Sequence, residues 1–415
     1  MLAEADPWPE GAGASGAAAA AGSGGQGTAG GAGGDAPSPC GTFDVLADDF
    51  ERPSGLWYGT LNTAFDGAAV LDLSGSLFGQ FVSHRTYSLA GGGISVRVDA
   101  SAAAPDVTMA MTLFDPTVLT LPSRATMVVD GSMLHGSVNA GDEAASAVEV
   151  FSVRYSPDAH ARWRIRENAG LVVFETATLD GDYQERGSTS TSMAGDIDIL
   201  QAEFHAASGA VGAGSVAFDD VNQGTTSASF CPMASFTEDF SVEMRSWLKL
   251  VPATCVATLA NGALQLTTEP ESSDCSWTTW QSFDLTGSHA RVRVPALSVD
   301  TPSYALMRLR FDAEQQQMIG VHEGQLRMTS QVAGRPNWEE SVAFLPSEHR
   351  WWGIRHDGTR LLFETSEDGS TWSTLRDIPP PPFLEGMTIG LAAGNFGEPA
   401  AFAGSVQFDD LNREP

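Results

Sequence analysis

The acidic side chains best placed for chemistry occur in the segment Asp196-Ile197-Asp198-Ile199-Leu200-Gln201-Ala202-Glu203. Two carboxylates that cleave a glycosidic bond with retention must share one face, with about 5–5.5 Å between them. Asp196 and Glu203 are seven positions apart, so on a strand they face opposite sides. We therefore predict no catalytic residue here, and an ordinary strand with Ile197 and Ile199 turned toward a core.

A second chemistry to consider is metal binding. Paired acids recur along the chain, and Ca²⁺ takes oxygen ligands of this kind. Acids at strand ends can equally well cap their own loops, and both interpretations stay open. The weak candidates for a structural calcium ion are Asp219, Asp220, Asp409 and Asp410. His160 and His349 have no close metal-ligating neighbour, so we predict structural roles for them, and no other cofactor.

Composition limits the classes of function. The chain of 415 residues has 22 basic and 52 acidic residues and a net charge of −30, which argues against binding to nucleic acid. It contains no apolar run of about 18 residues, so no transmembrane helix is predicted. The length suggests two or three domains.

The first part of the chain differs from the rest. Residues 11–34 are Gly, Ala or Ser except Gln26 and Thr28, a composition that cannot bury enough surface to offset chain entropy. Residues 1–39 are therefore predicted to be a disordered tether, similar to the linkers of bacterial surface lipoproteins. The first residues lack the basic and apolar regions of a secretory signal, so either the start lies upstream or a leader has been removed.

The remainder contains two copies of one pattern in the same order. The matched segments are Asp48-Asp49-Phe50 to Trp57 with Glu238-Asp239-Phe240 to Trp247, Trp163 with Trp352, Phe174-Glu175-Thr176 with Phe363-Glu364-Thr365, and Phe218-Asp219-Asp220 with Phe408-Asp409-Asp410. Domains are predicted at residues 42–230 and 236–415, each long enough for its own core.

Within each copy, apolar residues alternate with polar ones over short segments. Residues 290–294 and 304–311 have this period of two, which is typical of half-buried strands. Asn261-Gly262 between two such segments is a strong hairpin signal. We therefore predict an all-β fold of two tandem antiparallel sandwiches.

Part of the second copy resembles a known family. The run Arg350-Trp351-Trp352-Gly353-Ile354-Arg355-His356-Asp357-Gly358, the strand Phe363-Glu364-Thr365 and the turn Asp368-Gly369-Ser370-Thr371-Trp372 are similar to the hairpin pair of laminin-G-like modules. These belong to the concanavalin A-like lectin/glucanase superfamily. The resemblance implies two jelly-rolls with curved sheets and a concave face. Members of that superfamily bind glycans or proteins, and a minority are glucanases.

The four cysteines permit three pairings. Cys40 and Cys231 bracket the first copy and can meet if its first and last strands are neighbours, whereas Cys255 and Cys275 flank the Asn261-Gly262 hairpin. Two disulfides would place the protein in an oxidising compartment, outside the cell or on its surface. Four free thiols are the alternative.

Aromatic and basic residues suggest where a ligand could bind. Trp352 is expected in the core, so Trp351 should point outward and offer a flat surface to a sugar ring. Arginines that alternate with apolar residues would surround it on the same side. The predicted ligand-binding residues are Trp351, Arg355, Arg291, Arg293, Arg308 and Arg310. Pairing of these arginines with Glu175 and Glu364 on a solvated face is the alternative.

These observations predict a secreted or cell-surface carbohydrate-binding protein that is not an enzyme, with the second copy as the glycan binder. Its partner would be a glycan or surface polysaccharide. A second surface protein is the alternative partner, in which case the chain would be an adhesion or spacer module without a sugar site. A degenerate jelly-roll glucanase is the third interpretation.

Overall fold

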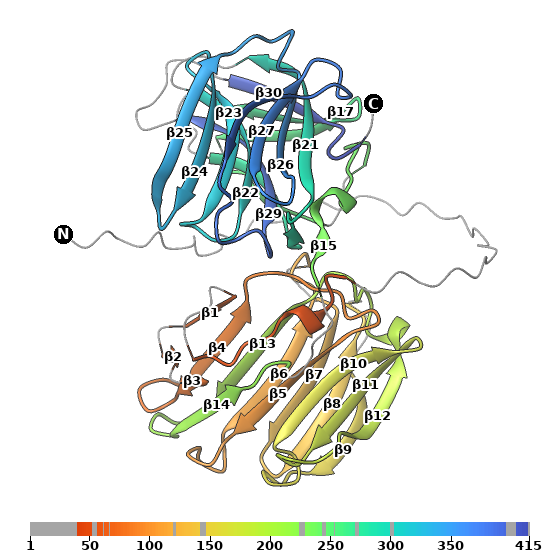
Figure 1. The fold of residues 1–415 in the computed structure, drawn as a ribbon. Coiled ribbons are helices and arrows are strands. Elements are labelled where there is room, and N and C mark those ends of the chain that lie inside the picture. The colour runs from red at the N-terminus through yellow and green to blue at the C-terminus, as the bar shows by residue number, and fades with distance from the viewer. Residues whose placement is uncertain are drawn as a thin grey trace, which may run out of the picture. The chain divides into compact units, whose positions relative to one another are not determined.

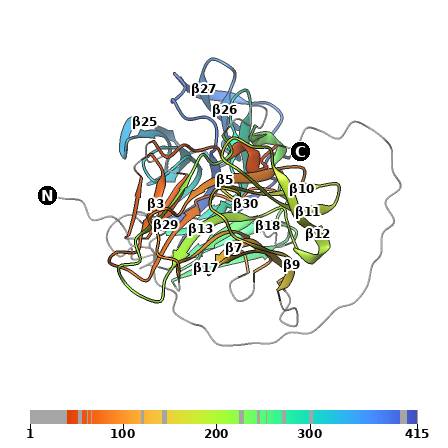
Figure 2. The ribbon, with the colours of Figure 1, turned by 90° about the horizontal axis from the view of Figure 1, so that it is seen from below.

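The computed structural model describes residues 40–51, 56–60, 62–65, 67–118, 122–141, 147–223, 229–242, 246–252, 254–269, 274–298, 303–395 and 404–413. The predicted tether, residues 1–39, lies outside this part of the chain. Strands joined by turns and loops make up nearly all of the regular structure (Figures 1 and 2). The helices among the described residues are the short 3-10 turns η1 (Phe43–Val45), η2 (Thr191–Met193) and η3 (Met233–Ser235). None of the described helices has the length and apolar character needed to span a membrane.

The first sandwich has two seven-stranded antiparallel sheets (Figure 1). Sheet A has the order β1 (Trp57–Gly59), β4 (Phe78–Ser83), β13 (Gln201–Ala207), β6 (Thr108–Phe114), β7 (Arg124–Asp130), β8 (Met133–Asn139) and β9 (Val148–Arg154). Sheet B has the order β12 (Gln184–Ser190), β11 (Leu171–Ala177), β10 (Arg162–Asn168), β5 (Gly93–Asp99), β14 (Ser215–Asp219), β3 (Ala69–Asp72) and β2 (Thr63–Phe65).

The strands of the second sandwich follow the order of the first, with sheet C corresponding to sheet A and sheet D to sheet B. Sheet C consists of β16 (Trp247–Leu250), β19 (Asp274–Thr279), β29 (Thr388–Asn395), β22 (Ser303–Arg310), β23 (Gln316–His322), β24 (Gln325–Val332) and β25 (Arg335–Ala343). Sheet D consists of β17 (Cys255–Ala260), β18 (Ala263–Thr268), β30 (Gly404–Asp409), β21 (His289–Ser298), β26 (Trp351–His356), β27 (Leu361–Ser366) and β28 (Ser373–Ile378). β15 (Cys231–Pro232) and β20 (Phe283–Asp284) form a short parallel pair. The predicted all-β sandwich fold is confirmed.

A hydrophobic core lies between the two sheets of each sandwich. Trp163 and Trp352 are fully buried in these cores, as predicted from their matched positions. The indole N–H of Trp163 donates to the carbonyl of His160 at 3.0 Å, and that of Trp352 donates to the carbonyl of His349 at 3.1 Å. His160 and His349 are themselves buried, and burial lowers the pKa of each imidazole. These histidines hold the tryptophans in place, which agrees with the structural role predicted for them.

The predicted hairpin at Asn261-Gly262 is present and joins β17 to β18. Both residues have positive φ, 56° and 72°, which is the backbone that a two-residue turn of this kind requires. The segment that contains Asp196 and Asp198 differs from its prediction. It is a loop, and β13 begins only at Gln201. Ile197 nevertheless packs against the core.

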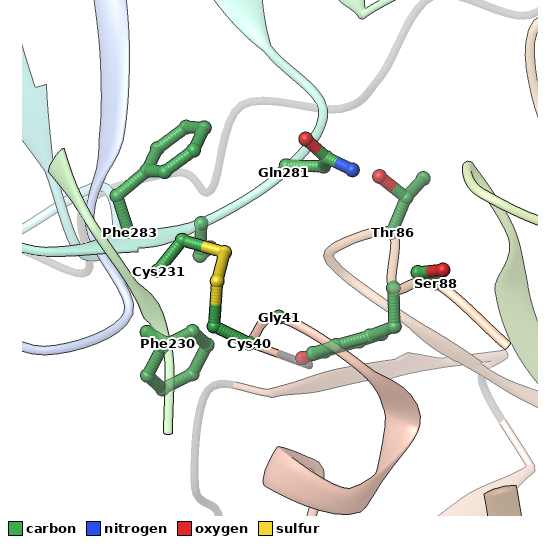
Figure 3. Close-up of a pocket in the computed structure, with 10 residues that line it drawn as sticks. Cys40, Gly41, Thr86, Ser88, Phe230, Cys231, Gln281 and Phe283 are labelled. Atoms are coloured by element: carbon green, nitrogen blue, oxygen red, sulfur yellow. A yellow bond between two sulfur atoms is a disulfide. The ribbon is translucent and has the colours of Figure 1, made fainter. Parts of the chain in front are cut away.

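Both predicted disulfides are formed. Cys40 and Cys231 are bonded to each other (Figure 3), and their Cα atoms are 4.8 Å apart. The pairing is possible because the ends of the first copy meet, with Asp48 bridged to Val221. Cys255 and Cys275 were expected to close the base of a hairpin. Instead they join β17 of sheet D to β19 of sheet C, so this disulfide links the two layers of the second sandwich.

Candidate functional site

Trp351 was predicted to be an exposed surface for a sugar ring, and this prediction is wrong. Its side chain does point away from the core that contains Trp352, but only 4% of the residue is exposed. The turn between β27 and β28 covers it. The ring of Trp372 packs edge-on at 6.4 Å between centroids, and a Cβ on Gly369 would lie 2.6 Å from the Trp351 ring.

The predicted arginines do not share one face. Arg291, Arg293 and Arg355 project from sheet D, whereas Arg308 and Arg310 project from sheet C. In each strand the neighbouring apolar residues enter the common core, so both groups of arginines point outward, from opposite layers of the sandwich. The single basic stripe that the alternation predicted is therefore absent from the described residues.

On sheet D the arginines surround a buried carboxylate. The Glu364 side chain is 3% exposed and accepts hydrogen bonds from Arg355, at 2.7 Å from Nη2 and 3.1 Å from Nε. Arg291 Nη2 donates to the same carboxylate at 3.4 Å. The hydrogen bond to Glu364 raises the pKa of Arg355. The alternative interpretation, cross-strand pairing of these arginines with Glu364, is thus the one that the structure supports.

The first sandwich has the same arrangement around Glu175. Arg164 Nε donates to this carboxylate at 2.5 Å, and Arg166 donates from Nε at 3.0 Å and from Nη2 at 3.1 Å. Burial raises the pKa of Glu175, but the hydrogen bonds from Arg166 and Arg164 more than offset it and leave the pKa below its usual value. Each sandwich thus stabilises one buried glutamate with two arginines.

The calcium candidates are also paired with arginine. Arg97 contacts both Asp219 and Asp220, and Arg293 Nη1 lies 3.3 Å from Asp409 and 3.4 Å from Asp410. In each pair the first carboxylate also accepts from the backbone N–H of the second aspartate. In the part of the chain that the structure describes, no group of three or more metal-ligating residues is found. The structure supports the loop-capping interpretation.

Arg308 and Arg310 make local contacts on sheet C. Arg308 lies across Gly390, where a Cβ would come within 2.8 Å of it, and its Nη2 donates to Ser276 Oγ at 3.1 Å. Arg310 Nε donates to the carbonyl of Asp312 at 2.9 Å. Neither arginine lies near Trp351, because the two sheets separate them.

A different cluster occupies the outer face of sheet A in the first sandwich. Tyr58 and Glu203 lie on either side of Val82, since each pairs with that residue across β1, β4 and β13. Two residues further along β13, His205 pairs with Gln80 of β4. Their side chains point outward because Phe204, between Glu203 and His205, is buried in the core.

Two exposed aromatic rings flank this polar pair. Tyr58 is 43% exposed and Phe78 is 41% exposed. Glu203 Oε1 lies 3.2 Å from His205 Nδ1, and the Phe78 ring lies 6.0 Å from the His205 ring. Burial raises the pKa of the Tyr58 phenol, and the charge of Glu203 adds to the rise. Phe78 is four residues from Val82 along β4, so the backbone positions that carry the two rings are about 13 Å apart along the strand direction. We call these four side chains, Tyr58, Phe78, Glu203 and His205, the sheet A cluster.

The second sandwich lacks this cluster. In the second sandwich Leu248 pairs with Thr278, and Thr278 pairs with Gly390. These three residues take the positions that Tyr58, Val82 and Glu203 have in the first sandwich. Arg308 lies over Gly390 and fills the position of the carboxylate.

The sheet A cluster was not predicted from the sequence. The alternation of Ala202, Glu203, Phe204 and His205 does predict that the two polar residues face outward. Nothing in the sequence places β4 between β1 and β13, and this order is what brings Tyr58 to the same face.

The small pocket beside the Cys40–Cys231 disulfide is not a candidate for a sugar. Its lining includes Thr86, Phe230 and Phe283 (Figure 3). Its volume of about 40 Å³ is enough for water but not for a pyranose ring.

No protein-family model and no curated protein matches this chain. Solved structures do match it. The laminarinase catalytic domain of Thermotoga maritima is 11% identical with a TM-score of 0.35, covering 42% of this chain and 95% of that one. A prokaryotic β-1,3-1,4-glucanase (lichenase) from a mouse hindgut metagenome is also 11% identical with a TM-score of 0.35, covering 42% and 96%. Crh5 transglycosylase is 13% identical with a TM-score of 0.36, covering 44% and 84%.

The names of these structures contradict one prediction. We predicted that the chain is not an enzyme, but the three matched proteins are two glucan hydrolases and a transglycosylase. We therefore withdraw that prediction. At this level of identity the likeness concerns the fold alone.

Proposed function

We propose that the chain binds carbohydrate on the outer face of sheet A, through the sheet A cluster, outside the cell or on its surface. The observation that carries this proposal is the placement of two exposed rings, Tyr58 and Phe78, around the Glu203–His205 pair. Ligand sites typically combine apolar or aromatic surface with a few polar groups that fix orientation.

The chemistry of a sugar fits these groups. The face of a pyranose ring that carries axial hydrogens is apolar and can pack on Tyr58 or Phe78, while its hydroxyl groups need hydrogen-bond partners. Glu203 supplies acceptors, and Nε2 of His205, whose Nδ1 faces Glu203, can accept from a sugar hydroxyl. The spacing of about 13 Å between the backbone positions of the two rings suits an oligosaccharide better than a single sugar.

The first sandwich replaces the second as the proposed glycan binder. The prediction of a site in the second sandwich depended on an exposed Trp351, and this residue is buried. The two disulfides support an oxidising, extracellular location. An adhesion or spacer module without a sugar site is the competing function.

A glycan array tests the proposal. The full chain should bind a defined set of oligosaccharides, and Tyr58→Ala and Phe78→Ala should each weaken that binding at least tenfold. Leu171→Ala, which removes an apolar side chain of similar exposure from sheet B, is the matched control and should bind normally. An array without any bound glycan, or equal binding by all variants, would contradict the proposal and favour the adhesion module.

Each glycan that binds should also be tested for cleavage, by measuring newly formed reducing ends. This readout is needed because Glu203 is a carboxylate on the proposed binding face, and a carboxylate in contact with a glycosidic bond can transfer protons.

A further inference from the structure

A pocket of about 200 Å³ opens on the outer side of sheet D in the second sandwich. It is built from η3, β21, the β27–β28 turn and the segment after β30. Its lining residues are Ala234, His289, Arg291, Gly369, Trp372, Asn412 and Arg413. We call it the sheet D pocket.

Two hydrogen bonds that frame this pocket recur in the first sandwich. Asn412 Oδ1 accepts from the N–H of Arg291 at 2.7 Å, and its Nδ2 donates to the carbonyl of Met233 at 2.9 Å. In the first sandwich Asn222 makes the same two bonds, to the N–H of Ser95 and the carbonyl of Phe43, both at 2.7 Å.

This shared frame identifies matching positions. Ser95 corresponds to Arg291, and Asp44, which follows Phe43, corresponds to Ala234, which follows Met233. Strand pairing shows that Gly93 corresponds to His289. Gly93 pairs with Arg166 in the first sandwich, and His289 pairs with Arg355 in the second.

The side chains at these positions differ in charge. Where the first sandwich has Asp44, the second has Ala234, which removes a carboxylate and leaves space. Where the first has Ser95, the second has Arg291, and where Gln223 follows Asn222, Arg413 follows Asn412. The second sandwich has thus lost an acid and gained one guanidinium group, that of Arg413, because Arg291 takes the place of Arg164, whose match in the second sandwich is Gly353.

Arg291 is held in a fixed position at the pocket wall. Its guanidinium carbon lies 4.2 Å from the centroid of the Trp372 ring, a cation–π distance, and its Nη2 donates to buried Glu364. Glu364 is shared with Arg355, so two guanidinium groups face one carboxylate. Arg291 and Arg355 together carry one more positive charge than the carboxylate that they share.

The remaining polar groups suit the same ligand. Arg413 forms an ion pair with Asp239 at 2.7 Å in which both side chains are more than 40% exposed, and such pairs are weak enough to be exchanged. Burial, followed by the charge of Arg291, lowers the pKa of His289 to about 4. The imidazole is therefore neutral at pH 7 and can still donate one N–H.

We propose that the sheet D pocket binds an oxyanion, in the form of a carboxylate, sulfate or phosphate group, between Arg291 and Arg413. Guanidinium groups bind planar and tetrahedral oxyanions with paired hydrogen bonds. This site is separate from the sheet A cluster and does not depend on the function proposed for it.

Calorimetric titration of the full chain with sodium glucuronate, sulfate and phosphate tests the site, with glucose as the neutral control. At least one anion should bind and glucose should not, and added sodium chloride should weaken the binding. Glucuronate alone would identify an acidic sugar as the source of the group, whereas binding of all three would identify a general oxyanion site. Absence of binding by all three would overturn the proposal.

Variants locate the site. Arg413→Ala should weaken anion binding at least tenfold, and Ala234→Asp, which introduces the residue of the first sandwich, should abolish it. Arg360→Ala removes an exposed arginine of the same sandwich that pairs with Asp377, and should bind as the unmodified chain does. If Ala234→Asp and Arg413→Ala both bind normally, or if Arg360→Ala loses as much affinity as they do, the pocket is not the site.

Discussion

Trp372 lies directly over Gly353 on the outer face of sheet D, where a Cβ on residue 353 would come within 2.9 Å of the indole ring. The matching position in the first sandwich is Arg164, which faces Ser95 as Gly353 faces Arg291. Arg164 itself lies over Tyr183, 3.9 Å from the ring centroid. Both sandwiches therefore place an arginine over an aromatic ring, but the arginine comes from β10 in the first and from β21 in the second.

Gly353→Ala should disturb this packing. The added methyl group forces the Trp372 ring away from β26, and overpacking of this kind typically costs about 1–3 kcal/mol. We expect a lower urea midpoint and weaker anion binding in the sheet D pocket, because the ring that supports Arg291 moves. Gly209→Ala is the control, since its Cβ would meet nothing within 4 Å. An unchanged urea midpoint for Gly353→Ala would show that the ring has room to move at no cost.

Glu175 should make the stability of the first sandwich depend on pH. Its pKa in the folded chain is below the ordinary value of 4.5, so its contribution is complete above about pH 4.5 and is lost as the pH falls through the folded pKa. Glu175→Gln leaves Arg164 and Arg166 without their shared carboxylate, which should cost about 3 kcal/mol at pH 7. Urea unfolding from pH 7 to pH 3 should show the difference between the two proteins shrinking below pH 4.5.

The exposed Glu185 of strand β12 provides the comparison for this measurement. Glu185→Gln should change the free energy of unfolding by less than about 1 kcal/mol at every pH, because exposed charges contribute little. A Glu175→Gln difference that stayed constant down to pH 3 would mean that the buried carboxyl has no lowered pKa.

The disulfide between the layers of the second sandwich should contribute to its stability. Cys255 and Cys275 are 20 residues apart, and closing a loop of this size is worth about 3 kcal/mol. The double variant Cys255→Ala/Cys275→Ala should therefore unfold at lower urea. Mass spectrometry of non-reduced peptides should recover the Cys255–Cys275 and Cys40–Cys231 pairs from the unmodified chain. Peptides that carry free thiols would contradict both the pairing and the extracellular location.

The sequence predicted the features that depend on local periodicity. Alternation placed Trp352 and Ile354 in the core, and Asn261-Gly262 located a hairpin, because both signals act over a few residues. The same alternation correctly turned Trp351 outward. It could not show that a later turn, with Gly369 and Trp372, folds over that ring.

Features that depend on strand order could not be predicted in the same way. Arg291 and Arg308 both alternate with core residues on consecutive long strands, which suggested a common face. The chain crosses from sheet D to sheet C between β21 and β22, so these arginines belong to different layers. The sheet A cluster was missed for the same reason, since Tyr58, Phe78 and Glu203 come from strands that are distant in sequence and adjacent only in the folded sheet.

Glu203 is the residue whose replacement bears most directly on the proposed glycan site. Glu203→Gln keeps the size of the side chain but removes the charge, and hydrogen bonds to a charged group contribute about 1.5–3 kcal/mol. Glycan binding should therefore weaken by at least tenfold. The pKa of Tyr58 should also fall, because the Glu203 charge helps to raise it. This second change can be followed by NMR titration of the tyrosine ring without any ligand.

The two readouts separate a structural effect from a functional one. If the pKa of Tyr58 falls while glycan binding is unchanged, Glu203 faces Tyr58 but does not contact the sugar, and the ligand must lie elsewhere on the molecule. Glu149→Gln is the matched control, because Glu149 also pairs with a histidine on the same sheet, His135 at 2.9 Å, but on the distant strand β9. If a bound glycan is also cleaved, loss of cleavage in Glu203→Gln but not in Glu149→Gln would assign the reacting carboxylate to the sheet A cluster.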